Sequence, residues 1–134
     1  MDMPNQKLQK ILHVDDDLDI QFIAKIALES VGGFTVQQCS SGAEAITKIS
    51  EFEPDLLLLD VMMPNMDGEE TLKTIRQLPR MANVPVVFMT AKALDSDKEA
   101  LLQKGAIDVI TKPFEPMELS GQLVAAWENA HALA

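Results

Sequence analysis

Apolar residues recur along the chain in two patterns that alternate from one end to the other. Short, nearly continuous apolar runs are followed by longer stretches in which apolar residues recur every three or four positions. The first pattern is typical of strands buried on both faces, and the second of amphipathic helices. Five such strand–helix units follow one another. They predict a doubly wound α/β fold with three layers, in which helices cover both faces of a parallel sheet.

The strands are separated by turn residues and proline. The third contains four consecutive leucines and is closed by Asp60. The strand 34–39 is expected at an edge of the sheet, because it is short and less apolar than the others. The five predicted strands are residues 8–14, 34–39, 56–59, 86–90 and 106–111.

The first helix is expected from about Asp17 to Val31, before the Gly32-Gly33 pair. At about 100° per residue, one face should pack on the sheet. Phe22 and Ile26 fall on roughly the opposite side, where they are either a docking patch or scattered surface residues. The residues expected to face the sheet are Ile20, Ile23, Ala24, Ala27, Leu28 and Val31.

Four further helices are expected. The second has a candidate N-cap in the Ser40–Gly42 turn and is stopped by Pro54, and the others span about 67–78, 95–104 and 115–131. Their predicted inward residues are Ala45, Ile46, Ile49 and Phe52; Leu72, Ile75 and Leu78; Leu101 and Leu102; and Met117, Leu123, Val124 and Trp127. His131 continues the last stripe near the helix C-terminus, where we expect it to be a favourable partner of the helix dipole or a surface residue.

Composition narrows the class of protein. A chain of 134 residues is long enough for one domain, which we expect over residues 1–134 with its core at about 8–131 and no output domain. A net charge of −10 argues against a nucleic-acid partner. The single cysteine, Cys39, excludes an internal disulfide and is expected to be a buried or idle thiol. With no signal peptide and no run of membrane-spanning length, we expect a cytoplasmic protein that does not insert into membranes.

Polar residues that packing does not require follow four of the five strands. Asp15 and Asp16 come after the first strand, Asp60 after the third, Thr90 ends the fourth and Lys112 follows the fifth. Parallel strands present their carboxyl ends at one edge, where ligands bind in open α/β sheets. Three carboxylates at that edge repel each other unless cations join them. Lys112 offsets one charge, and Mg²⁺ favours such a carboxylate set.

Each of these residues has an ordinary explanation when it is considered alone. Asp16 or Asp17 could cap the first helix. Thr90 and Lys112 are unremarkable as single residues, and His13 is expected to be a strand side chain because no second His or Cys lies nearby. The indication of a site therefore comes from the four strand ends taken together.

Four motifs are specific in combination: ILHVDDD, LLLLDVMMPNMDG, VVFMTA and the Lys112-Pro113-Phe114 triplet. Over residues 11–127, the chain resembles the receiver domain of two-component response regulators, the CheY-like family. The resemblance implies a flavodoxin-like, five-stranded sheet in the order 2-1-3-4-5 and a phosphoryl switch.

The resemblance also assigns roles to residues. Asp60 matches the phosphorylated aspartate. Asp15 and Asp16 match the acidic pair that, with Asp60 and the backbone carbonyl of Met62, holds Mg²⁺ (or Mn²⁺). Thr90 matches the hydroxyl that moves to bond the phosphoryl group.

Three further positions follow from the same resemblance. Lys112 matches the cation that pairs with the phosphoryl group, and the Lys112–Pro113 bond is expected to be cis. Ala91 is small and leaves room for a phosphoryl donor. The implied partners are a histidine kinase or histidine phosphotransfer protein and an unknown downstream protein. The implied state is a monomer or a weak phosphorylation-dependent dimer. The sequence begins with a Met and stops just after the fifth predicted helix, and on that basis we expect a stand-alone regulator.

The chain departs from the family pattern at the switch. Val109 stands where many relatives have Tyr or Phe, so we expect a smaller or different output change. Met62 and Lys92 occupy variable positions that flank the acceptor site. Since Met62 cannot hydrogen-bond an attacking water, we expect slow autodephosphorylation.

Three rival interpretations share parts of this pattern. A haloacid-dehalogenase-like phosphatase would use Asp15 as its nucleophile, but Asp19 stands where its motif needs Thr or Val. A flavodoxin-like FMN binder needs donors after the first strand, where this chain has three acids. An EF-hand fails because Ile20 and Ile26 replace the required glycine and glutamate.

Overall fold

The computed structural model describes residues 7–92 and 94–132. The opening residues, for which we expect no signal peptide, lie in part outside these ranges. The elements follow in the order β1 (Lys10–Val14), α1 (Leu18–Lys25), η1 (Ile26–Val31), β2 (Thr35–Cys39), α2 (Gly42–Phe52), β3 (Leu56–Asp60), α3 (Gly68–Ile75), β4 (Val86–Thr90), α4 (Asp95–Gln103), β5 (Asp108–Thr111) and α5 (Pro116–Ala132).

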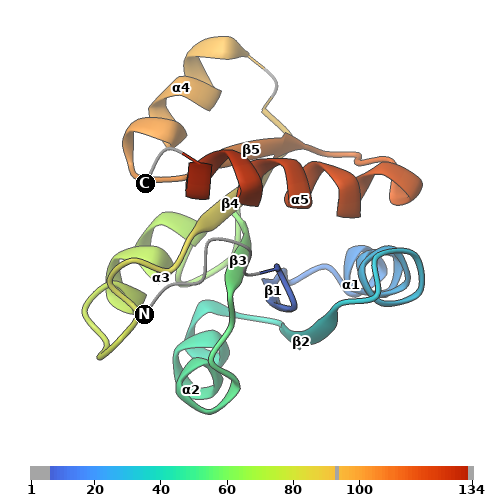
Figure 1. Ribbon diagram of the computed structural model, residues 1–134. Coiled ribbons are helices and arrows are strands. Elements are labelled where there is room, and N and C mark those ends of the chain that lie inside the picture. Colours follow the sequence, from blue (N-terminus) through green and yellow to red (C-terminus); the bar gives the residue numbers. More distant parts are fainter. Residues whose placement is uncertain (1–6, 93, 133–134) are drawn as a thin grey trace.

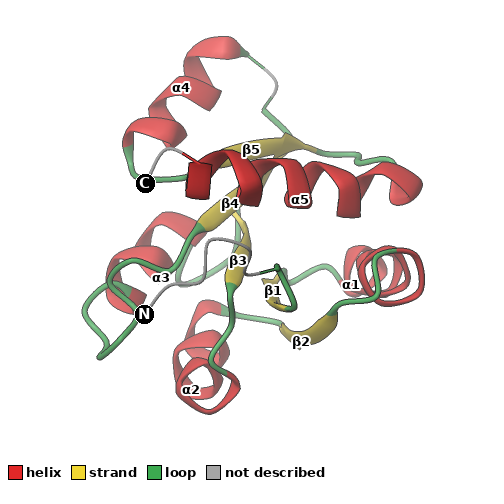
Figure 2. Ribbon diagram, viewed as in Figure 1, coloured by secondary structure: helices red, strands yellow, loops and turns green. Residues whose placement is uncertain are grey.

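All five strands are parallel and lie in the order β2-β1-β3-β4-β5 (Figure 1). The predicted architecture and strand order are confirmed, and β2 lies at an edge as expected. Figure 2 shows the strands as a middle layer with helices on both sides. The carboxyl ends of β1, β3, β4 and β5 therefore meet at one edge, which is the edge that the sequence predicts to carry the chemistry.

Two hydrophobic clusters, one on each face of the sheet, form the core. Leu57 and Leu59 belong to one cluster together with residues of α2, α3 and α4. Leu56 and Leu58 belong to the other, with residues of α1, η1 and α5. Because successive strand side chains point to opposite faces, the four-leucine run of β3 supplies both clusters.

Side-chain caps fix the start of three helices. Asp17 Oδ1 accepts the N–H groups of Asp19 and Ile20 at the start of α1. Ser41 Oγ accepts from Glu44 N at the start of α2, as the sequence predicts. Asp67 and Glu70 form a reciprocal capping box at the start of α3. Asp17, rather than Asp16, is thus the capping carboxylate of α1, which leaves Asp16 available at the sheet edge.

The first helix differs from its prediction. Ala24, Ala27 and Leu28 are buried as expected, but Ile23 and Val31 are exposed. From Ile26 onward the chain forms the π-helix η1, in which Gly32 N donates to Ala27 O five residues back. A π turn holds more residues than an α turn, so it rotates Val31 away from the sheet.

The last two helices also show corrections. In α5, Leu123 and Trp127 are buried, but Met117, predicted to face inward, is 72% exposed. His131 is exposed, in agreement with its prediction as a surface residue near the helix C-terminus. Leu119, which the predicted stripe missed, is fully buried. In α4, Leu101 is buried whereas Leu102 is exposed. None of the helices in the described ranges has the length and apolar character that a membrane crossing requires.

Candidate functional site

Two buried carboxylates and one ammonium group meet at the carboxyl edge of the sheet. Asp15 follows β1 and Asp60 is the last residue of β3, and both are buried. Lys112 Nζ lies 2.9 Å from Asp15 Oδ2 and 3.0 Å from Asp60 Oδ1. The structure therefore brings together three of the predicted site residues, in a bridge between strands that are not neighbours in the sequence.

Burial and the pairing between Lys112 and the two carboxylates shift the pKa values of these groups in opposite directions. Burial raises the pKa of Asp60; the hydrogen bond from Lys112 lowers it, and the nearby Asp15 carboxylate raises it further. Burial by itself lowers the pKa of Lys112, but its close pairing with the carboxylates of Asp15 and Asp60 prevails, and its pKa is raised. Lys112 thus stays protonated, whereas the excess of carboxylates leaves the site short of positive charge.

The third predicted carboxylate completes a set that suits a divalent ion. One oxygen from each of Asp15, Asp16 and Asp60 lies within 4.8 Å of the other two. Asp15 Oδ2 has the Lys112 ammonium beside it but accepts no well-directed hydrogen bond from the described residues. Hard oxygen donors with free lone pairs are the ligands that Mg²⁺ prefers. The residues present therefore fit the predicted ion.

Thr90 lies at the end of β4, beside the acidic group. It is buried, and its Oγ1 accepts a hydrogen bond from Lys92 N at 3.1 Å. Ala91 and Lys92 are exposed, which leaves the approach to the sheet edge open on this side. Val109, on β5, is half-buried and packs against the cluster on the α2–α3 face.

The loop between β3 and α3 folds tightly back on Asp60. Gly68 N donates to Val61 O at 2.9 Å, and a Cβ at Gly68 would lie 2.3 Å from the carbonyl oxygen of Asp60. Only glycine allows α3 to start so close to the end of β3. Within this loop, Met62 is exposed. The Lys112–Pro113 peptide on the other side of the site is cis, as predicted.

Sequence reasoning missed a group of polar residues behind the acidic edge. Gln21 Nε2 donates to the Asp15 carbonyl at 2.6 Å, and Gln38 Nε2 donates to the Gln21 carbonyl at 2.7 Å. His13 is buried on β1, as predicted, and its Nδ1 lies 3.1 Å from Gln38 Nε2. Burial lowers the pKa of His13 to about 3, with a smaller contribution from Lys112, so His13 is neutral. Glutamine in an amphipathic helix usually faces water, so no pattern singled out Gln21.

The predicted surface residues of the first helix lie on an exposed apolar patch. Phe22 is 68% exposed, and Ile26 is also exposed. Leu18 and Ile23 join them, although the sequence placed Ile23 in the core. These residues lie on α1 and η1, next to the end of β1 that carries Asp15.

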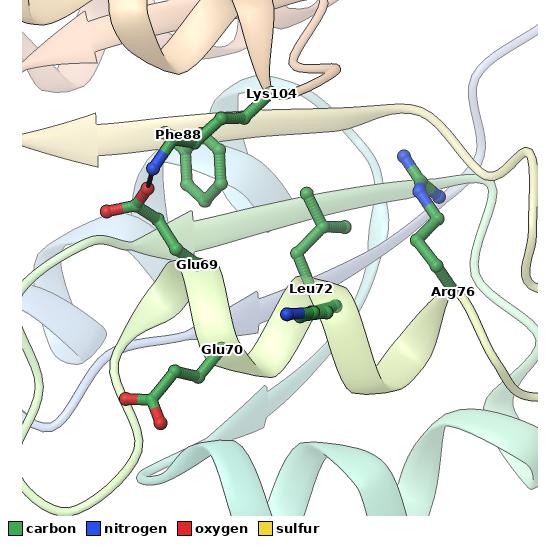
Figure 3. A pocket seen from close by; sticks show the side chains of 7 residues that line it. Glu69, Glu70, Leu72, Arg76, Phe88 and Lys104 are labelled. Carbon is green, nitrogen blue, oxygen red and sulfur yellow. Dashed lines mark hydrogen bonds and ion pairs between the residues drawn. The ribbon is translucent and has the colours of Figure 1, made fainter.

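A separate cavity of about 500 Å³ lies beside α3 (Figure 3). An ion pair between Glu69 and Lys104 crosses one side of it, and Arg76 lines another part. Its apolar lining residues, Leu72 and Phe88, are almost entirely buried. The cavity contains none of the predicted site residues, so the acidic edge remains the candidate site.

Comparisons with known proteins agree with this geometry. A sequence profile described as "Response regulator receiver domain" matches residues 11–124. The chain is 42% identical over 118 residues to the "Transcriptional regulatory protein CpxR homolog" of Haemophilus influenzae, covering 88% of this chain and 50% of that protein. It is 38% identical over 109 residues to an "Uncharacterized 14.6 kDa protein in sodA1 3'region" of Leptolyngbya boryana, covering 81% and 82%. The chain thus spans about half the length of the first of these relatives.

Solved structures show the same similarity. The chemotaxis protein CheY4 of Vibrio cholerae has a TM-score of 0.81 at 28% identity, covering 89% of this chain and 98% of that chain. A "response regulator receiver domain protein (CheY-like)" of Methanospirillum hungatei has a TM-score of 0.80 at 27% identity, covering 96% and 100%.

Proposed function

Since the chain belongs to the response regulator receiver family, we propose that it is a phosphoacceptor in a two-component phosphorelay. In this proposal Asp60 takes a phosphoryl group from a phosphohistidine of a histidine kinase or a histidine phosphotransfer protein. One observation carries the proposal. Lys112 Nζ lies within 3.0 Å of both Asp15 and Asp60, and Asp16 completes a three-carboxylate set at the same sheet edge.

Asp60 is suited to the role of nucleophile. It is held at the end of β3, with one carboxylate oxygen paired to Lys112. In the reaction, a carboxylate oxygen forms an O–P bond while the P–N bond of the phosphohistidine breaks. The ring nitrogen of the leaving imidazole takes a proton from water. Because burial raises the pKa of Asp60, the pairing with Lys112 is needed to keep the nucleophile ionised.

Asp15, Asp16 and Asp60, with the backbone carbonyl of Met62, would hold Mg²⁺ or Mn²⁺. When bound, such an ion neutralises charge on the oxygens of the phosphoryl group that is transferred. Lys112 performs the same task as a fixed ammonium group. The exposed positions of Ala91 and Lys92 leave space for the donor.

After transfer, Thr90 is the group that responds. A phosphoryl group on Asp60 brings about −1.5 to −2 charges and strong acceptors. The Thr90 hydroxyl can then donate to it, which changes the contact between Thr90 Oγ1 and Lys92 N and moves the loop after β4. We propose that this loop, with α4, β5 and α5, signals to a downstream protein by direct contact. Because residue 109 is valine, no aromatic ring at this position takes part in the change.

The kinase or phosphotransfer protein is proposed to dock on α1. The exposed apolar side chains of Leu18, Phe22, Ile23 and Ile26 gather next to the acidic edge. A partner helix that covered them would bring its phosphohistidine close to Asp60. The patch thus suits a partner that must deliver a group to the end of β3.

The test is chemical labelling. Wild type and Asp60→Asn are incubated with Mg²⁺ and acetyl phosphate, and the modified residue is mapped by mass spectrometry. We expect wild type to be phosphorylated at Asp60, in a reaction that EDTA stops, and Asp60→Asn to remain unmodified there. Labelling at Asp15 would indicate the phosphatase-like alternative, and an unmodified wild type would contradict the proposed function.

A further inference from the structure

Gln21, on α1, reaches the edge of the sheet at the point where the chain leaves β1. Its Nε2 donates to the Asp15 carbonyl at 2.6 Å, with Ser40 Oγ at 3.1 Å and the Cys39 carbonyl at 3.3 Å. Cys39 and Ser40 lie at the end of β2, the strand that pairs with β1. One side-chain amide therefore ties α1 to the ends of two adjacent strands.

We infer that Gln21 is a positioning residue for the metal site, acting through the peptide that joins Asp15 and Asp16. This inference rests on the proposed function, because it concerns the carboxylates proposed to hold the ion. The accepting carbonyl belongs to the peptide unit between these two residues, and a peptide unit is planar. Holding its oxygen fixes the orientation of that plane, and with it the direction in which the chain carries Asp16.

The two carboxylates depend on Gln21 to different degrees. Asp15 has its own anchors: its N–H donates to Cys39 O at 3.0 Å, its Oδ1 accepts from Asp17 N at 2.9 Å, and its Oδ2 pairs with Lys112. Asp16 is exposed and lies beyond the last of these strand contacts. Loss of the Gln21 amide therefore leaves Asp15 in place and removes a direct restraint on the peptide that carries Asp16. The effect falls on metal affinity more than on folding.

Gln38 holds Gln21 in place from the sheet. Its Nε2 donates to the backbone carbonyl of Gln21 at 2.7 Å and lies 3.1 Å from Nδ1 of the buried His13. An amide nitrogen carries two hydrogens, so Gln38 can serve both acceptors at once. The position of α1 is thus fixed against β1 and β2, which lets the side chain of Gln21 keep a defined reach to the Asp15 carbonyl.

The experiment compares two glutamines of the same region. Gln21→Met keeps the length of the side chain but removes its donor. Gln37→Met is the matched control, because Gln37 lies on β2 and its Nε2 donates a local bond to the Gln38 carbonyl at 3.1 Å, away from Asp15 and Asp16. Dissociation constants for Mg²⁺ and Mn²⁺ are measured by calorimetry. We expect Gln21→Met to bind about tenfold more weakly, the lower end of the effect of groups that orient metal ligands. Gln37→Met should bind like wild type.

A second measurement separates positioning from a purely structural role. The Mg²⁺ concentration that gives the half-maximal rate of acetyl phosphate labelling should rise for Gln21→Met in parallel with its Kd. The rate at saturating Mg²⁺ should stay near that of wild type. Thermal unfolding in EDTA shows whether the variant is folded. Gln21→Asn, whose side chain is too short to reach the carbonyl, repeats the test with a second variant.

The outcomes are distinct. If Gln21→Met and Gln21→Asn bind Mg²⁺ and Mn²⁺ with the same Kd as wild type, the inference is overturned, even if the unfolding temperatures of the variants fall. If wild type binds metal and is labelled at Asp60, and the Gln21 variants have the same metal affinity, only the positioning role of Gln21 is overturned. Wild type that binds neither Mg²⁺ nor Mn²⁺ overturns this inference together with the metal dependence of the proposed function.

Discussion

At the scale of single residues, Lys112 balances two carboxylates that would otherwise be buried close together without compensation. Its side chain is 17% exposed and contacts both Asp15 and Asp60. The attraction in a buried ion pair adds little net stability, because burying the charges is costly. Removing one partner is strongly destabilising, because it leaves the other charges buried and unpaired. Lys104 makes a contrasting ion pair with Glu69 at the surface, where its side chain is 57% exposed.

These two lysines yield a paired prediction. Lys112→Met should lower the free energy of unfolding by about 3 kcal/mol without metal, because it leaves two buried carboxylates unpaired. Lys104→Met should cost less than about 1 kcal/mol, as is usual for exposed pairs. Urea denaturation in EDTA measures both. Equal losses in the two variants would contradict the role given to Lys112.

Cys39 permits a second prediction at this scale. Burial raises the pKa of its thiol to about 11, with Glu44 adding to the effect, against an ordinary value of 9.0. A difference of about two pKa units lowers the thiolate fraction about a hundredfold near neutral pH. Reaction with Ellman's reagent at about pH 8 should therefore be at least that much slower in the native protein than in guanidinium.

The raised pKa of Cys39 also makes the stability of the fold depend on pH. Since the folded-state pKa of Cys39 is raised, folding favours the neutral thiol, and stability falls as the pH rises from 9.0 towards about 11. Cys39→Ala should show a smaller loss over that range. Rapid reaction of the native thiol at neutral pH would show that Cys39 is neither buried nor perturbed in solution.

The candidate residues differ in how well the sequence predicted them. Asp15, Asp60 and Lys112 were predictable, because charge directly after an apolar run marks the end of a strand, and parallel strands end at one edge. Gln21 and Gln38 were not, because an uncharged amide has the same pattern whether it faces water or a buried carbonyl. Thr111 is also an uncharged polar residue whose sequence pattern does not predict its surroundings: its Oγ1 is buried and has no hydrogen-bond partner among the described residues.

At the scale of elements, periodicity predicted each helix and strand but not every buried face. The α1 pattern assumed a uniform α-helix, and the π turn of η1 moved Val31 out of the predicted face. Ala27 and Leu28 stay buried as predicted, whereas Ile23, which precedes η1, is exposed. In α5, Met117 lies about one-third of a turn from the line through Leu123 and Trp127, which are both buried. The predicted stripe included Met117, which is exposed, and omitted Leu119, which is fully buried. In the fold, the strands decide which part of a broad apolar face is covered.

The junction of β3 and α3 supplies the prediction at this scale. Gly68→Ala places a Cβ about 2.3 Å from the Asp60 carbonyl, so the start of α3 must move. Overpacking of this kind costs about 1–3 kcal/mol. We expect that loss in urea denaturation, together with slower labelling of Asp60 by acetyl phosphate. Gly121→Ala is the control.

Gly121 lies within α5, and apart from its chain neighbours and the backbone of its own helix, no atom of the described residues would lie within 4 Å of a Cβ there. Alanine in a helix interior is favoured over glycine by about 0.5–1 kcal/mol. Gly121→Ala should therefore be slightly more stable than wild type and should be labelled at the same rate. A Gly68→Ala variant with the stability and labelling rate of Gly121→Ala would show that the β3–α3 junction tolerates displacement.

At the scale of the whole molecule, charge and topology act together. The chain carries 21 acidic and 11 basic residues, and the parallel sheet directs three of the acids to one point. A global excess of negative charge of this kind favours solubility and raises the local concentration of cations. It does not determine where they bind. The strand order does, because it places the ends of β1 and β3 side by side.

A divalent ion should therefore stabilise the entire fold through this one site. With Mg²⁺ at ten times its Kd, the free energy of unfolding should rise by about 1.4 kcal/mol. Asp16→Asn should lose most of this gain and keep its metal-free stability, because Asp16 is exposed. Thermal unfolding with and without MgCl₂ measures the difference.

The control must separate specific binding from screening. In a protein of net charge −10, any salt weakens self-repulsion and stabilises the compact state to some extent. NaCl at the ionic strength of the MgCl₂ sample reproduces that screening without a divalent ligand. The difference between the two salts is therefore the part that belongs to the site, and most of it should be lost in Asp16→Asn. A wild-type protein that gains as much from NaCl as from MgCl₂ would show that its acidic edge responds to ionic strength alone.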